Sequence, residues 1–180
     1  ISLEKAEHLE DLINEFFEIT RFNLSNITLE YSRVNLTRML EQLIYEFKPM
    51  LLEKNLKCEL EIAPDTMIKC DVNKMQRGFD NLLRNAVNYS FDDSTIHIAV
   101  KQNGENLCIQ FTNCGNTIPK EKLVRIFEQF YRLDVARSSR SGGAGLGLAV
   151  AKEIVELHNG TITAKSENEQ IEFTVTLPLL

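Results

Sequence analysis

The hydrophobic positions at the start of the chain recur at intervals of three and four residues, the spacing of an α-helix. They are Leu9, Leu12, Ile13, Phe16, Phe17 and Ile19. A stripe this broad is too apolar to remain in water, so we expect helices from a longer protein or a second copy to cover it. The pattern predicts a bundle helix over residues 1–25, with docking on the chain's own domain as the alternative.

A polar stretch follows, and the helical pattern starts again at Leu36. We therefore interpret residues 26–35 as a linker and residues 36–180 as a second, larger unit. Asn35 is a suitable N-cap for the new helix, whose apolar positions run to Leu51. A third helix is predicted over Val72–Tyr89.

Short runs of alternating apolar and polar residues predict strands in the rest of the chain. They lie near residues 58–62, 96–100, 107–111, 161–164 and 171–177, with Asn103-Gly104 as a hairpin turn and a further helix over 145–157. Helices and strands are mixed without strict alternation. This order favours an α+β two-layer sandwich, with a mixed, mostly antiparallel sheet and helices on one face.

Composition and charge exclude several classes of protein. With 43% hydrophobic residues and 10 Phe, the 180-residue chain can bury a core, and its four cysteines lack zinc or redox spacing. A net charge of −6 gives no overall basic field for nucleic acid or an anionic membrane. No run reaches the ~18 apolar residues of a membrane span. The chain opens at Ile1 within a helical pattern, so we expect it to belong to a longer protein.

A glycine-rich run, Gly-Gly-Ala-Gly-Leu-Gly-Leu over residues 142–148, precedes the last predicted helix. Glycines let a backbone approach a ligand closely, and the free N–H groups of a helix's first turn favour an anion such as phosphate. The spacing matches neither a Rossmann fingerprint nor a Walker loop. A phosphate site is therefore expected here, with a merely flexible loop as the alternative.

Asparagine recurs on one face of the third predicted helix, at Asn81, Asn85 and Asn88. Asparagine is a mediocre helix former, so its repetition needs a reason. Carboxamide oxygens suit Mg²⁺, which binds through one or two protein oxygens together with phosphates. The alternative is an exposed polar face.

Residues 120–140 contain six bases and three acids, a local positive excess within an acidic chain. Basic side chains on a mobile loop can close over phosphates. The local charge is therefore what such a loop would need.

These segments together resemble a known family. In chain order, the Asn-rich helix, residues 113–119, residues 127–132 and residues 143–148 resemble the N, G1, F and G2 boxes of sensor histidine kinase catalytic domains. The resemblance covers residues 34–180. The first helix and the segments around residues 130–134 and 142–148 look similar to the vancomycin-resistance sensor kinases in particular.

The resemblance implies a Bergerat ATP-binding fold, with ATP and Mg²⁺ between the Asn-rich helix and a flexible lid over residues 129–142. By motif position, Asn85 would hold the metal ion and Arg132 would address the terminal phosphate, which makes these two the catalytic residues. Asn113 would meet the adenine amino group, and Gly115 would allow the base to approach closely. The nucleotide-binding residues would be Asn81, Asn88, Tyr89, Asn113, Gly115, Gly143, Gly145, Leu146 and Gly147.

Three positions depart from the family pattern. Asn113 stands where the G1 box has Asp, so its amide oxygen would accept from the adenine amino group. Thr117 replaces a glycine and implies a stiffer turn. Asn88 stands where Lys or His is common, which leaves more of the phosphate charge to Arg132.

The family's acceptor motif, a His followed by an acid, Leu, a base, Thr and Pro, is absent around His8, His97 and His158. The phosphoacceptor is therefore expected outside this chain, on a helical hairpin whose second helix resembles residues 1–25. The resemblance also implies a homodimer in the full-length protein, a response regulator receiver domain as partner, and a cytoplasmic domain whose parent protein is anchored in the cell membrane.

Related ATPases carry a Glu four residues before the metal-binding Asn, and Asn81 is not a base, so hydrolysis is expected to be slow. The favoured function is ATP-dependent histidine phosphorylation, and the narrower resemblance points to signalling in glycopeptide-antibiotic resistance. Two alternatives stay open: a non-catalytic dimerisation or nucleotide-binding module with a degenerate site, and a serine kinase of the anti-sigma type.

Overall fold

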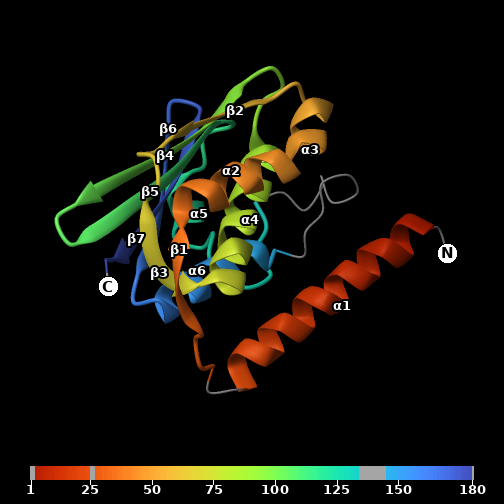
Figure 1. Ribbon diagram of the computed structural model, residues 1–180. Helices are drawn as coiled ribbons and strands as arrows, with labels where there is room; N and C mark the ends of the chain where they lie inside the picture. Colours follow the sequence, from red (N-terminus) through yellow and green to blue (C-terminus); the bar gives the residue numbers. More distant parts are fainter. Residues whose placement is uncertain (1–2, 25–26, 134–144, 180) are drawn as a thin grey trace.

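A computed structural model describes residues 3–24, 27–133 and 145–179 of the chain (Figure 1). One layer is a five-stranded sheet. Its strands, in spatial order, are β2 (Lys57–Glu61), β4 (Thr95–Asn103), β5 (Asn106–Cys114), β7 (Gln170–Pro178) and β6 (Thr161–Glu167). The pairing of β2 with β4 is parallel, and the other three pairings in this sheet are antiparallel.

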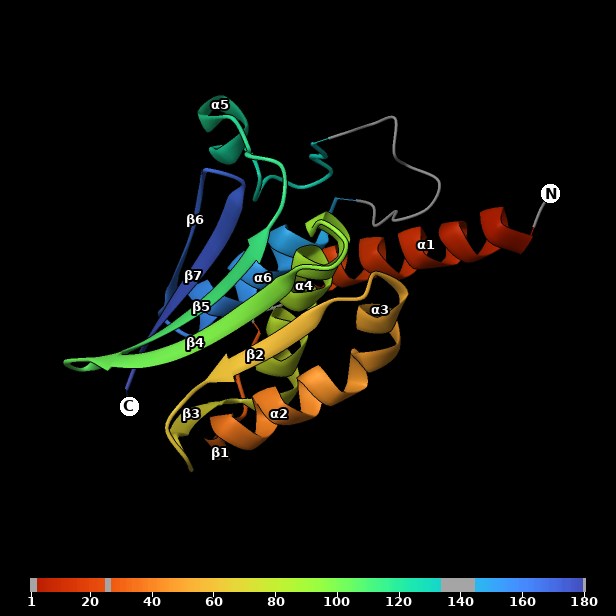
Figure 2. The ribbon, with the colours of Figure 1, turned by 90° about the horizontal axis from the view of Figure 1, so that it is seen from above.

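Helices cover one face of this sheet (Figure 2). They are α2 (Leu36–Glu46), α3 (Lys48–Glu53), α4 (Val72–Tyr89) and α6 (Gly147–Leu157), and the short α5 (Lys120–Leu123) lies apart, beyond the ends of β6 and β7. The predicted two-layer sandwich with a mostly antiparallel sheet is confirmed. The third helix has the predicted bounds, whereas the second is divided at Phe47, two residues before Pro49.

A two-stranded ribbon was not predicted. It pairs β1 (Tyr31–Asn35) with β3 (Met67–Asp71) in antiparallel register. Residues 31–35 thus belong to the folded unit, and the predicted linker over 26–35 ends inside a strand. The hairpin between β4 and β5 also differs slightly, because Asn103 pairs with Asn106 and the turn falls on Gly104, at φ +61°, and Glu105.

The N-termini of two helices are capped by side chains at the ends of the ribbon. The Oδ1 atom of Asn35 accepts the N–H of Arg38 at 3.1 Å, and Oδ1 of Asp71 accepts the N–H of Lys74 at 3.1 Å. Each bond satisfies one of the donors that a first helical turn leaves unpaired. The N-cap predicted at Asn35 is confirmed, and Asp71 fixes where α4 begins.

The core lies between the sheet and the helices. Alternate residues of β5 point into it, namely Leu107, Ile109, Phe111 and Asn113. Burial raises the pKa of the Cys58 thiol to about 12 and that of Cys70 to about 11, with smaller contributions from Glu59 and Asp71. The four cysteines are unpaired, and Cys58 packs against the core as a small hydrophobic residue, as predicted.

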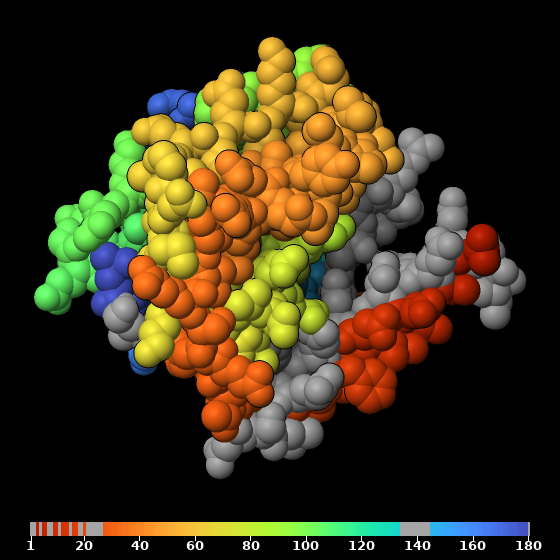
Figure 3. Space-filling model, viewed as in Figure 1, coloured from red at the N-terminus to blue at the C-terminus, as the bar shows by residue number. Residues whose placement is uncertain are grey.

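The first helix, α1 (Leu3–Leu24), projects from the rest of the molecule as a rod (Figures 1 and 3). Its apolar side chains Leu9, Ile13, Phe16 and Phe17 are exposed, by 45% to 61% of their surface. Helical structure is as predicted, and the role of this helix in a bundle stays a prediction. Among the described residues, no helix is both long and apolar enough to cross a bilayer.

Candidate nucleotide-binding cleft

Two helices bring the Asn-rich and glycine-rich segments together. A Cβ atom on Gly78 of α4 would lie 3.4 Å from Ile154 of α6, and a Cβ atom on Gly147 would lie 3.2 Å from Oδ1 of Asn81. The helices therefore pack closely along antiparallel directions. The first turn of α6 faces the middle of α4, where the asparagines lie.

A buried histidine fixes the far ends of these two helices. Nε2 of His158, just after α6, accepts the backbone N–H of Asp71 at 3.0 Å, and Nδ1 lies 2.7 Å from the carbonyl oxygen of Ile154. Because Asp71 is the donor, the ring proton is on Nδ1 and is donated to Ile154. His158 is 3% exposed, so its role here is structural.

The carboxylate of Asp71 completes this junction. Its Oδ2 atom accepts the N–H of Glu30 at 3.0 Å, while Oδ1 caps α4. Burial alone would raise the pKa of Asp71, but the two N–H donors, assisted by the charge of Lys74, outweigh it and lower the pKa. The charged form of Asp71 therefore stabilises the start of α4 and the attachment of the segment at Glu30.

A cleft of about 110 Å³ opens between the two helices and the segment after α5. Its lining consists of Asn81, Arg84, Asn85, Asn88, Tyr89, Ile118, Ile126, Tyr131, Arg132, Leu133, Gly145, Gly147 and Leu148. A larger hollow of about 470 Å³ adjoins it and shares Asn88, Tyr89, Ile118 and Leu133. The larger hollow by itself has the size of a small-molecule site.

Backbone contacts explain two of the glycines. Gly145 has φ +78°, and a Cβ there would lie 2.8 Å from the carbonyl oxygen of Tyr131 and 3.1 Å from Cγ of Arg132. Its own carbonyl accepts the N–H of Phe130 at 3.0 Å. The glycine turn thus packs directly on the segment that bears Arg132, and a side chain at either Gly145 or Gly147 would intrude on the cleft wall.

The first turn of α6 has the properties of an anion site. Leu146 occupies its N-cap position and provides no side-chain acceptor for the first N–H groups. Gly147 and Leu148, whose N–H groups belong to that turn, line the cleft. The positive end of the helix dipole and these donors favour a negatively charged group.

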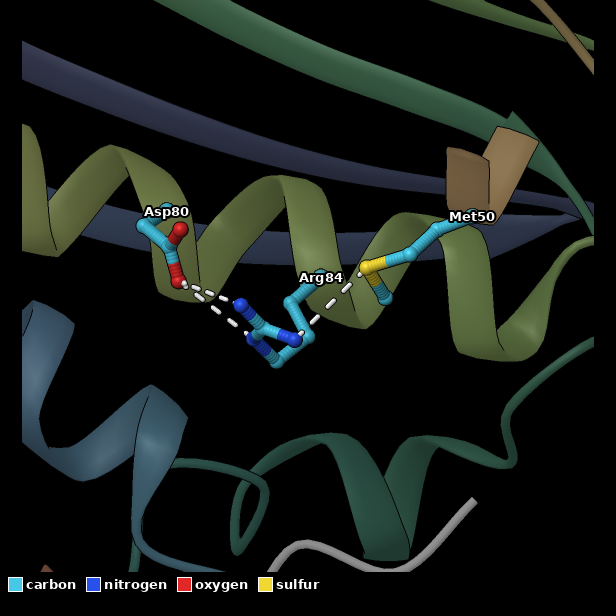
Figure 4. Close-up of polar contacts among 3 residues, drawn as sticks. All are labelled: Met50, Asp80 and Arg84. Atoms are coloured by element: carbon cyan, nitrogen blue, oxygen red, sulfur yellow. Dashed lines mark hydrogen bonds and ion pairs between the residues drawn. The ribbon is translucent and has the colours of Figure 1, made fainter. Parts of the chain in front are cut away.

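Two arginines add positive charge to the cleft. Arg132 was predicted, and Arg84 was missed. Figure 4 shows Arg84 projecting from α4, with Nε and Nη2 at 3.3 and 3.2 Å from Oδ2 of Asp80 and Nη1 at 3.7 Å from the sulfur of Met50. The position of Arg84, three residues after Asn81 and four before Asn88, could have indicated its place on the cleft side of the helix.

Asn113 lies in the core, 1% exposed, at the end of β5. Its Oδ1 and Nδ2 atoms have no hydrogen-bond partner among the described residues, which is costly for a buried amide. Gly115 packs tightly against the end of α4. A Cβ there would collide with the carbonyl oxygen of Tyr89, and its expected role toward a base stays a prediction.

The loop after Asn113 is tied to the turn between β6 and β7. The N–H of Gly115 donates to the carbonyl of Glu169 at 2.9 Å, and the hydroxyl of Thr117 accepts the N–H of Glu169 at 2.8 Å. Ser166 Oγ accepts the N–H of Ile118 at 2.9 Å. The threonine that replaces a glycine therefore anchors this loop, in agreement with the stiffer turn expected.

The structure brings most predicted site residues together. The cleft is lined by Asn81, Asn85, Asn88, Tyr89, Arg132, Gly145 and Gly147, while Leu146 is buried between the two glycines, Asn113 is buried at the end of β5, and Gly115 packs behind Tyr89. Gly143 and residues 134–142 of the predicted lid lie outside the described residues. The lining residues Ile118, Ile126 and Leu148 were missed because isolated apolar residues carry no chemical signal.

Carboxamides are the metal-binding groups available in the cleft. No cluster of three or more His, Cys, Asp or Glu side chains that could hold a metal ion occurs in the described part of the chain. A hard cation bound here would thus need oxygens from Asn85 or Asn81 together with those of its ligand. Mg²⁺ shared with phosphates binds in this manner.

Comparisons with known proteins agree with this geometry. Residues 70–180 match the family model described as histidine kinase-, DNA gyrase B- and HSP90-like ATPase. The chain is 48% identical over 178 residues to the sensor protein VanSC of Enterococcus gallinarum, covering 99% of this chain and 49% of that protein. It spans about half the length of this curated relative. The resemblance to vancomycin-resistance sensor kinases is confirmed.

Solved structures share the fold at low sequence identity. Full-length ShkA in complex with AMPPNP aligns with a TM-score of 0.85 at 22% identity, over 98% of this chain and 37% of that one. Histidine kinase ThkA in complex with the response regulator protein TrrA aligns with a TM-score of 0.82 at 21% identity, over 97% and 49%. With its sequence, fold and cleft in agreement, the chain belongs to the family of histidine kinase-, DNA gyrase B- and HSP90-like ATPases.

Proposed function

We propose that this chain is the ATP-binding catalytic part of a sensor histidine kinase, which donates the γ-phosphoryl group to a histidine outside the chain. The observation that supports this most is the meeting of Asn81 with Gly147 beside a cleft that also contains Asn85 and two arginines. Carboxamides, helix N–H groups and guanidinium groups are together suited to a metal-bound polyphosphate.

In this proposal the phosphates lie against the first turn of α6. Its N–H groups and Arg132 bind the phosphate oxygens, with further positive charge from Arg84. Asn85 holds Mg²⁺, assisted by Asn81, and the ion when bound neutralises charge on the phosphates. Gly145 and Gly147 keep the wall free of side chains, so that the backbone approaches the phosphates closely.

The base lies toward Asn113 and Tyr89. The amide of Asn113, buried without a partner among the described residues, provides an acceptor for the adenine amino group and a donor for a ring nitrogen. A nucleotide that forms these bonds removes the cost of the unpaired amide. This gain, available only in the complex, favours adenine over bases with a different donor and acceptor pattern.

The lining of the cleft favours transfer over hydrolysis. Among its described residues there is no Asp, Glu or His that could act as a general base toward water. Asn81, the polar residue against Gly147, has no basic group. The phosphoryl group is therefore retained until an acceptor imidazole, itself a nucleophile, enters the site.

The apolar stripe of α1 supports a larger assembly. Exposed Leu9, Phe16 and Phe17 would be buried by the other helix of a phosphoacceptor hairpin and by the same hairpin of a second copy. We infer a homodimeric, membrane-anchored parent protein that passes its phosphoryl group to a response regulator receiver domain, in signalling of glycopeptide-antibiotic resistance. The likeness to VanSC supports this inference.

A transfer assay tests the proposal. The chain is mixed with a hairpin that supplies the acceptor histidine and with γ-labelled ATP and Mg²⁺. Label is expected on the hairpin, with Asn85→Ala and Arg132→Ala reducing it by about a hundredfold. Asn103→Ala, at the exposed end of β4, is the matched control and should leave transfer unchanged. Saturable ATP binding without any transfer would instead identify a non-catalytic module.

A further inference from the structure

A lysine outside all the recognised motifs supports one wall of the cleft. Nζ of Lys54, the residue that ends α3, donates to the carbonyl oxygens of Val87 at 2.9 Å, Asn88 at 3.3 Å and Ser90 at 2.5 Å. These carbonyls belong to the last turn of α4 and to the residue after it. An ammonium group has three donors, and here each has a partner at the same helix end.

Ser90 binds a further carbonyl of this helix end. The N–H and Oγ of Ser90 donate to the carbonyl of Ala86 at 3.0 and 2.6 Å. The carbonyl of Tyr89 lies against Gly115. A helix ordinarily leaves its last four carbonyls without intrahelical partners, and a cation there also interacts favourably with the helix dipole. Lys54 therefore binds two of the last four carbonyls of α4, together with that of Ser90, which follows the helix.

The lysine itself is held in place by a tight turn. Asn55 has φ +51°, and its Nδ2 atom donates to Oδ1 of Asp93 at 2.6 Å. The backbone carbonyl of Lys54 accepts the N–H of Asp93 at 3.0 Å. The segment after α4 is thus joined to the end of α3 both through the lysine side chain and through its main chain.

This cap lies at the cleft. Lys54, Asn88, Tyr89 and Ser90 all line the larger hollow, and Asn88 and Tyr89 also line the smaller one. Two predicted nucleotide-binding side chains therefore extend from the turn of backbone whose carbonyls the lysine binds. A shift of this turn would move both side chains at once.

We propose that Lys54 is a positioning residue for nucleotide binding: it clamps the C-terminal end of α4 and so places Tyr89 and Asn88 against the base side of the cleft. The inference rests on the proposed function, since it concerns the same nucleotide site. Lys54 acts through the backbone carbonyls, and its ammonium group makes no direct contact with the phosphates.

Nucleotide titrations of Lys54→Met test this role. Met has a similar length but no donor, so we expect affinity for Mg-ATP and for adenosine to fall by the same factor, about tenfold. Lys54→Arg retains donors to the carbonyls and should recover most of the affinity. Lys69→Met, an exposed lysine of β3, is the matched control and should bind as the unchanged protein does.

The outcomes separate positioning from other roles. Loss of thermal stability with unchanged affinity for both ligands would overturn the proposal, because the lysine would then be structural only. Loss of Mg-ATP affinity without loss of adenosine affinity would also overturn it, since it would show direct contact with phosphates. Absence of nucleotide binding by the unchanged protein would contradict the proposed function alone.

Hydrogen exchange tests the clamp independently of any ligand. In Lys54→Met the N–H groups of Ser90 and Phe91 are expected to exchange faster, while those in the middle of α4 keep their protection. Equal protection in the two proteins would contradict the clamp, even if the variant proved too unstable for titration.

Discussion

A Cβ atom placed on Gly147 would lie 3.2 Å from Oδ1 of Asn81, across the line where α6 meets α4. The two residues come from segments that the sequence singled out for different reasons, one for metal-binding amides and one for a backbone phosphate site. Their contact places both kinds of group at one cleft. The proposed nucleotide site requires that these two segments meet, as they do here.

Gly147→Ala separates stability from binding. Its Cβ would press on Asn81 and narrow the cleft, while the gain in helix propensity over glycine is less than the ~1 kcal/mol of a helix interior, because Gly147 is the first residue of α6. We expect unchanged or slightly higher thermal stability together with Mg-ATP affinity about tenfold weaker. Titration calorimetry and thermal unfolding of one sample measure both quantities.

Gly78→Ala is the matched control, because it too lies between α4 and α6 but away from the cleft. Its Cβ would meet Ile154 at an ordinary 3.4 Å, so the expected effect is about 0.5–1 kcal/mol of added stability with unchanged affinity. Equal affinities of the two alanine variants would show that Asn81 is not part of the site.

Asn113→Leu removes an amide that is buried without a partner among the described residues. A side chain of similar size without polar atoms should increase the free energy of unfolding by about 1–2 kcal/mol, because an unpaired buried amide is costly. The same change removes the proposed adenine contact, so ATP binding should be lost. Urea unfolding measures the change in stability, and nucleotide titration measures the loss of ATP binding. A less stable variant would mean that the amide already has partners in the unliganded protein.

Arg84→Gln tests the arginine that the sequence analysis missed. Loss of this charge should weaken Mg-ATP binding several-fold, about 1 kcal/mol, and should make that binding less dependent on salt. The affinity for adenosine should change little. The control Arg38→Gln changes an exposed arginine of α2 and should alter the affinity for neither ligand. If adenosine affinity fell as much as that of Mg-ATP, Arg84 would act on the shape of the cleft and not through its charge.

Asp71 predicts how stability depends on pH. Its pKa is lower in the folded protein than in the unfolded chain, so its stabilising contribution is complete above the unfolded pKa and is lost as the pH falls through the folded value. The free energy of unfolding should therefore fall with acidification below about pH 4. Asp71→Asn should be less stable at neutral pH by about 1 kcal/mol, having one acceptor oxygen instead of two.

The measurement is urea unfolding of the unchanged protein and of Asp71→Asn at several pH values. The difference between their free energies of unfolding should be largest near neutral pH and should narrow in acid, where the carboxylate is protonated. A difference that stays constant from neutral to acidic pH would show that Asp71 does not carry its charge at the junction of α4 and α6.

The sequence predicted the larger elements because their patterns are local. The hydrophobic positions of residues 72–89 repeat over about five turns, and the alternation in residues 107–111 is complete, so neither needed tertiary information. The ribbon of β1 and β3 was missed because each strand has only five residues, and its pairing joins residues more than thirty positions apart. Such pairing is visible only once the chain is folded.

Some residues of the candidate site could likewise be predicted from local motifs, whereas others depend on tertiary contacts. Asn81, Asn85 and the glycine turn belong to motifs that can be read along the chain. Arg84 and Lys54 act through neighbours that the fold supplies, a cleft for the first and the end of α4 for the second. The packing of Gly115 on the carbonyl of Tyr89 likewise depends on a contact between separate elements, which the sequence does not show.

Titration calorimetry of ATP with and without Mg²⁺ tests the proposed site most directly, on the unchanged protein and on Asn85→Ala. We predict saturable binding of one nucleotide per chain, tightened about tenfold by Mg²⁺ in the unchanged protein and not in Asn85→Ala. The proposed site would be contradicted if the unchanged protein bound no ATP, or if Mg²⁺ tightened binding equally in both proteins.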